Sequence, residues 1–169
     1  MDKTKRELGH LEDGEHMMHF ALALINASKL HKGTGVWGER IIILHLDHAN
    51  ELLMKSFLIK KGFIISYLEK DKVSKKEGTK EEEFLDKSKS IDYDDCLKLV
   101  CRNLPQNAFE DDKQKKIMKF HYLRNEIQHR AINIHQDKKT EIELFYPYFK
   151  ELYHLMFPEF ADVFPDYTE

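Results

Sequence analysis

The stretch FHYLRNEIQHR at residues 120–130 lies in a run with helical periodicity that begins near Asp111. It places a permanent cation, Arg124, directly before Asn125 and five residues before His129. An arginine fork holds phosphate oxygens, and a histidine exchanges protons near neutral pH. This pattern therefore suits phosphate chemistry. The alternative is an amphipathic helix whose basic side chains simply face water.

The same helix is locally basic. Six Lys or Arg and one acid occur between residues 113 and 130, although the chain as a whole has a net charge of −3. A polyanion would therefore bind a local patch and not the surface as a whole.

The composition describes one soluble globular domain over residues 1–169, with 41% hydrophobic and 34% charged residues. The two cysteines, Cys96 and Cys101, have neither the spacing of a metal site nor a disulfide framework, so we expect free thiols and a cytoplasmic protein. We expect no signal peptide, because no apolar run follows the charged N-terminus, and no membrane span, because polar residues interrupt every apolar stretch well before about 18 residues.

Apolar periodicity predicts an all-α fold, an antiparallel bundle of four to five helices. The expected helices cover about 15–30, 39–61, 93–103, a run from near 111, and 144–157. Gly62 and Asp92 are predicted to cap the second and third helices, and Thr140 and Glu143 have capping-box spacing before the last. On the last helix, aromatic side chains at helical spacing predict core or dimer packing, with stacking on RNA bases as the alternative.

Two segments between the second and third helices are harder to assign. Residues 63–68 have the composition of a strand, but no second strand is evident to pair with them, so we predict a short extension or helical turn packed on the core. Residues 69–90 are rich in Lys and acids and are predicted to form a charged loop or insertion.

Two motifs resemble the HEPN superfamily of small α-helical proteins. The pair Arg124 and His129, with Asn125 after the arginine, fits the R-x4-H motif of its ribonuclease members. Glu51 and Lys55 look like the E-x-x-x-K helix that precedes the catalytic helix in many of these proteins. The resemblance implies a HEPN-like domain and a ribonuclease that needs no metal or other cofactor. In such enzymes the 2′-hydroxyl of RNA attacks the neighbouring phosphorus and leaves a 2′,3′-cyclic phosphate.

The resemblance also implies roles for individual residues. His129 would transfer protons, and Arg124 would stabilise charge on the phosphate oxygens. Asn125 would orient the histidine ring or donate to a phosphate oxygen. Glu51 would either pair with Lys55 on the surface or contact Arg124 or His129. The candidates for RNA contact are Lys116, Lys119, His121 and Arg130.

Helix geometry predicts that one copy of the motif is incomplete. Arg124 and His129 lie about 140° apart around a straight helix, since each residue turns the helix by about 100°. Family members build composite sites at dimer interfaces, so we expect a homodimer that acts on RNA. A microbial defence or toxin–antitoxin setting, with an antitoxin or regulatory partner, is implied by resemblance alone. Ala131 stands where many antitoxin-controlled members carry a tyrosine, which puts that control in doubt.

Two alternatives remain open. The first is a HEPN-like module that binds RNA, a nucleotide or a protein without cutting. The second is a metal-binding bundle, because His45, His48 and Glu51 recur every three residues on one helix. The order of these residues differs from the Glu-x-x-His motif of di-iron bundles, so we predict no metal site.

Overall fold

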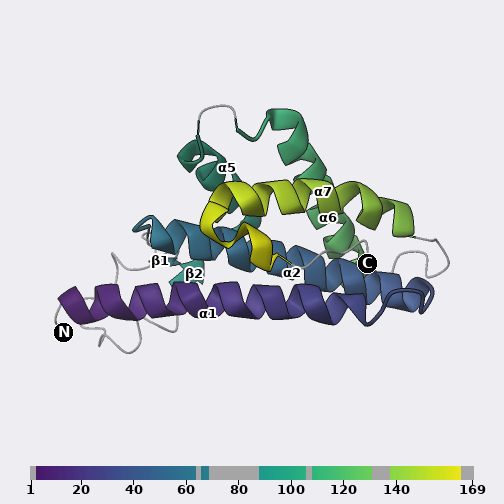
Figure 1. The fold of residues 1–169 in the computed structure, drawn as a ribbon, viewed down its shortest axis with the longest axis horizontal. Helices are drawn as coiled ribbons and strands as arrows, with labels where there is room; N and C mark the ends of the chain where they lie inside the picture. The colour runs from purple at the N-terminus through teal and green to yellow at the C-terminus, as the bar shows by residue number, and fades with distance from the viewer. Residues whose placement is uncertain (1–2, 64–65, 69–87, 106–107, 131–137, 165–169) are drawn as a thin grey trace, which may run out of the picture.

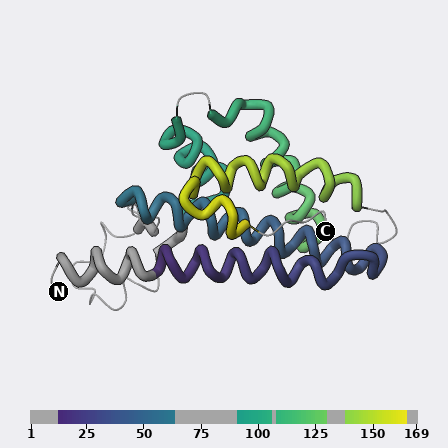
Figure 2. Tube along the Cα trace, viewed as in Figure 1, coloured from purple at the N-terminus to yellow at the C-terminus, as the bar shows by residue number. Residues whose placement is uncertain are grey.

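The computed structural model describes residues 3–63, 66–68, 88–105, 108–130 and 138–164. It confirms the predicted all-α bundle. Helix α2 (Val36–Lys60) lies between α1 (Lys3–Lys29) and a group of three helices, α5 (Tyr93–Asn103), α6 (Asp111–Arg130) and α7 (Lys139–Met156), and it contacts all four (Figure 1). Figure 2 shows the same arrangement as a Cα trace, with α1 on one side of α2 and the three later helices on the other.

Helix α1 is longer than the sequence predicts. It begins at Lys3 and not near residue 15, and it runs antiparallel to α2 along most of its length (Figure 1). Before residue 15 the chain has no apolar stripe that would give a helical signal. At Gly14 the two helices lie close together: a Cβ built there would lie 3.1 Å from Ile59 Cγ2, so glycine permits this approach.

The central helix α2 ends as predicted. Gly62 adopts a φ of 84°, a left-handed conformation that glycine reaches without strain. Its N–H donates to the carbonyl of Ile59 at 2.8 Å, and the N–H of Phe63 donates to Leu58 at 2.9 Å. These two bonds form a Schellman motif, which satisfies carbonyls at the end of the helix.

The prediction for residues 63–68 was wrong. Strand β1 (Ser66–Leu68) pairs antiparallel with β2 (Ser88–Ser90), so a second strand does exist. It lies at the end of the segment 69–90 that was predicted to be loop, of which residues 69–87 lie outside the described part of the chain. The sequence of β2, Ser-Lys-Ser, has no β-branched or aromatic residue, which is why it gave no strand signal.

The later helices begin in different ways. Helix α5 has the predicted cap, because the side chain of Asp92 accepts from the backbone N–H of Asp95 at 3.0 Å. The capping box predicted before α7 was wrong: the helix begins at Lys139, so Thr140 already lies in its first turn. A residue of α2 supplies the acceptor there, since the backbone N–H of Lys138 donates to Glu39 Oε2 at 2.7 Å.

Aromatic side chains of α7 fill the core between this helix and its neighbours. Phe145, Phe149 and Tyr153 are at most 2% exposed, which confirms core packing for this part of the helix. Phe145 stacks on Phe120 of α6, with ring centroids 3.7 Å apart. This contact joins α6 to α7, and it lies on the side of α6 away from the exposed His129.

Candidate active site

Arg124 is directed toward the central helix. Its Nε donates to Oδ2 of Asp47 at 2.9 Å, and its Nη2 lies 3.7 Å from Oε2 of Glu51. The Asp47 carboxylate is completely buried, and the Arg124 side chain is 20% exposed. Because a buried carboxylate requires a counter-charge, the pair joins α6 to α2 electrostatically as well as by packing.

Asp47 and Arg124 form a closed hydrogen-bonded circuit with two further side chains, those of His121 and Asn125. We call this circuit the Asp47 network. Nδ1 of His121 lies 3.0 Å from Asp47 Oδ2, and Nε2 of the same imidazole lies 3.1 Å from Nδ2 of Asn125. Oδ1 of Asn125 accepts from Nη1 of Arg124 at 2.8 Å, and Arg124 Nε returns to Asp47. The second hydrogen of Nη1 goes to Gln128 Oε1 at 3.0 Å.

Helix α5 also contacts the Asp47 network, through Tyr93. The Tyr93 ring of α5 stacks on the His121 imidazole, with centroids 3.8 Å apart and planes 13° from parallel. The Tyr93 hydroxyl accepts from Asn50 Nδ2 at 2.5 Å. Burial, reinforced by the negative charge of Asp47, holds the pKa of Tyr93 well above its usual value. The phenol therefore stays neutral and serves as a fixed platform for His121.

Glu51 contacts both Lys55 and Arg124, but its pair with Lys55 is not at the surface. Lys55 Nζ donates to Glu51 Oε1 at 2.5 Å as an i, i+4 pair, and the lysine is buried. The other oxygen of Glu51 faces Arg124 at 3.7 Å. Glu51 therefore lies between two cations and borders the Asp47 network.

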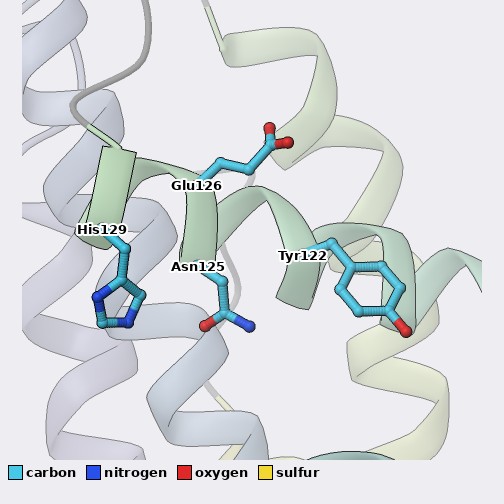
Figure 3. Close-up of a pocket in the computed structure, with 4 residues that line it drawn as sticks. All are labelled: Tyr122, Asn125, Glu126 and His129. Atoms are coloured by element: carbon cyan, nitrogen blue, oxygen red, sulfur yellow. The ribbon is translucent and has the colours of Figure 1, made fainter.

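His129 lies on a different face of α6. It lines an open pocket of about 350 Å³ with Tyr122, Asn125 and Glu126. Figure 3 shows Asn125 and His129 side by side with their side chains pointing the same way, while Glu126 points away from them. Arg124 does not line this pocket, in keeping with the angular separation expected from helix geometry. Asn125 therefore belongs both to the Asp47 network and to the pocket.

The structure places two candidates differently from the sequence-based prediction. The histidine bonded to Asn125 is His121, one turn before it, and not His129. His121 itself, a candidate for RNA contact, is only 13% exposed and faces Asp47. Lys116 and Lys119 are exposed on α6, and Arg130 is its last residue.

Sequence reasoning missed Asp47, Asn50 and Tyr93. One signal was available for Asp47: it is the one acid between Glu39 and Glu51 in an otherwise strongly apolar helix. A charge at such a position requires a partner once the helix is buried. Nothing local in the sequence identifies His121 and Arg124 as that partner, because they lie 74 and 77 residues away.

Three other features of the chain bear on metal binding, cysteine reactivity and membrane insertion. Among the described residues, no cluster of three or more His, Cys, Asp or Glu has the arrangement of a metal site, including the region of His45, His48 and Glu51. Cys96 and Cys101 are free, and burial raises their pKa values to about 12 and about 11. No helix in the described ranges is long and apolar enough to cross a membrane.

No protein-family model, no curated protein and no solved structure matches the chain. The likeness to the HEPN superfamily therefore rests on the two sequence motifs.

Proposed function

We propose that the protein is a metal-independent endoribonuclease of the HEPN type, with Arg124, Asn125 and His129 as its reactive residues. One observation carries the proposal. Asn125 accepts a hydrogen bond from Arg124 and also lines the pocket that contains His129, so the three motif residues are linked although they face different directions. The pocket is open to solvent, as a site for a polymer requires.

The reaction needs only proton transfer and charge stabilisation. The 2′-oxygen of a ribose forms a bond to the adjacent phosphorus, and the bond from phosphorus to the 5′-oxygen of the next nucleotide breaks. His129 accepts the proton of the 2′-hydroxyl, and an acid returns a proton to the departing 5′-oxygen. Arg124 and the amide of Asn125 donate to the non-bridging oxygens as their charge grows. The products are a 2′,3′-cyclic phosphate and a 5′-hydroxyl.

A second copy of the chain completes the site in this proposal. One helix offers one histidine to the pocket, whereas the reaction uses both a base and an acid. Tyr122, which is 59% exposed, lines the pocket beside His129 and gives a partner copy an apolar surface to cover. A two-fold axis near this face would bring two copies of the pocket together and supply the second histidine.

One observation favours the non-catalytic alternative, a HEPN-like module that binds RNA or a protein. Nε and both hydrogens of Nη1 in Arg124 already have acceptors in Asp47, Asn125 and Gln128. An arginine held in this way serves the fold, and only Nη2 is left to meet a phosphate.

Incubation of the purified protein with single-stranded RNA in EDTA distinguishes these functions. We expect the wild type to release fragments with 2′,3′-cyclic phosphate ends, and His129→Ala to release none. Lys115→Ala is the matched control, because Lys115 is exposed on the same helix and, within the described ranges, pairs with Asp112 one turn away. RNA binding without cleavage would establish the non-catalytic function, and cleavage that appears only when a metal is added would refute the mechanism.

The dimer is tested separately by sedimentation of the active protein. A monomer that retains full cleavage would contradict the composite site and leave the reaction itself intact.

A further inference from the structure

The direction of every hydrogen bond in the Asp47 network can be assigned from chemistry. A guanidinium has donors and no acceptor, so the atom of Asn125 that faces Arg124 must be its oxygen. The amide nitrogen of Asn125 then faces Nε2 of His121, and it can only donate. Nε2 must therefore carry a lone pair and not a proton.

The same reasoning fixes the other side of the imidazole. A neutral imidazole carries one proton, and with Nε2 free of it, that proton resides on Nδ1. Nδ1 faces the buried carboxylate of Asp47, which accepts it. The circuit contains one carboxylate, one guanidinium and two neutral groups, so it carries no net charge. Every bond is satisfied only in this arrangement.

We propose that His121 is a positioning residue that acts through Asn125: as the neutral Nδ1–H form, it holds Arg124 in one orientation and leaves Nη2 as the donor offered to a phosphate. Among the described residues, Nη2 has a Glu51 oxygen at 3.7 Å, which is too long for a hydrogen bond. The role in RNA cleavage rests on the proposed function, whereas the proton arrangement is a property of the protein alone.

Protonation of His121 would break the arrangement. A second proton on Nε2 would place two donors face to face, and the Asn125 amide would have to turn, which removes the acceptor from Arg124. Among the described residues, the imidazole faces Asp47 on α2 and stacks on Tyr93 of α5. The Tyr122 ring lies 6.3 Å from it, and Arg124 is linked to it through Asn125.

Asn125 consequently selects the charge state of His121. An aspartate at the same position would still accept from Arg124, but it would present an oxygen to Nε2 of His121. Two acceptors cannot share that contact without a hydrogen between them. Asn125→Asp is therefore expected to convert His121 into an imidazolium that lies between two carboxylates.

Nitrogen-15 NMR of the folded protein without RNA tests the inference. At pH 7.5 we expect His121 in the wild type to be protonated on Nδ1 alone, and in Asn125→Asp to be protonated on both nitrogens. His121→Gln assigns the signals by their loss. A wild-type His121 that is protonated on Nε2, or an Asn125→Asp protein with neutral His121, would overturn the proposal.

The guanidinium of Arg124 gives a second and independent measurement. Rotation about its C–N bonds should be slow in the wild type, so that Nη1 and Nη2 give separate signals. Asn125→Ala and His121→Ala should merge them, whereas Lys115→Ala should leave them resolved. Separate signals that persist in His121→Ala would show that His121 does not position Arg124. Neither measurement depends on cleavage, so absence of ribonuclease activity would refute the proposed function and leave this inference standing.

Discussion

Replacement of Arg124 by alanine should destabilise the protein well beyond the loss of a surface contact. The substitution leaves the Asp47 carboxylate, which is 0% exposed, without its cationic partner. Breaking a buried ion pair from one side costs about 3–5 kcal/mol, and the 20% exposure of Arg124 and the remaining bond from His121 reduce this to about 2–3 kcal/mol. A loss of that size lowers the melting temperature of a chain of this length by roughly 5–10 °C.

Urea denaturation of a double-mutant cycle measures this coupling. Asp47→Asn removes the buried charge, so adding Arg124→Ala to it should cost much less than Arg124→Ala costs in the wild-type background. Gln128→Ala is the matched control, because it removes a neutral partner of the same guanidinium and should cost less than about 1 kcal/mol. Additive free energies in the cycle would refute the electrostatic account.

Three further predictions concern other parts of the molecule. Asp92→Ala should cost about 1 kcal/mol in urea denaturation because it removes the cap of α5. Asp94→Ala, which removes an exposed i, i+4 pair, should cost clearly less, and equal losses would contradict the cap. Burial raises the pKa values of Cys96 and Cys101 to about 12 and about 11. At pH 8 both thiols should therefore react with a disulfide reagent only after unfolding. Rapid labelling of the native protein would contradict their buried placement. Burial, with added repulsion from His31 and His48, lowers the pKa of His45, so the folded state resists protonation of this side chain. The free energy of unfolding should therefore fall as the pH drops below about 6.5. His45→Gln should reduce this fall, and an unchanged pH profile in the variant would contradict the prediction.

Much of the fold was predictable from patterns within single helices. The ranges of α2 and α5 and their caps at Gly62 and Asp92 follow from apolar periodicity and from local backbone chemistry. The misses share a cause, since each depends on a distant contact. Around Gly14, α1 packs closely on Ile59 of α2, β2 pairs with β1, and the N-terminus of α7 takes an acceptor from Glu39.

For the candidate site too, features within one helix were predictable and contacts between helices were not. The spacing of Arg124, Asn125 and His129 was visible in the sequence, and their angular separation followed from the geometry of one helix. The partners of Arg124 were not visible, because Asp47 and Tyr93 come from other helices. A sequence motif identifies residue types at a spacing, but the choice of His121 over His129 as the partner of Asn125 depends on where α2 places a buried carboxylate.

Because Arg124 has structural partners and His129 does not among the described residues, only one of the two substitutions can test catalysis. Arg124→Ala removes a donor for phosphate and also disrupts the Asp47 network, so loss of cleavage in that variant would not separate chemistry from folding. His129 is exposed, and among the described residues it has no hydrogen bond or ion pair to lose. His129→Ala should therefore leave the urea midpoint unchanged while it abolishes cleavage. If His129→Ala cleaves RNA at the wild-type rate, the motif has a structural role here, and Arg124 is retained for Asp47 and not for RNA.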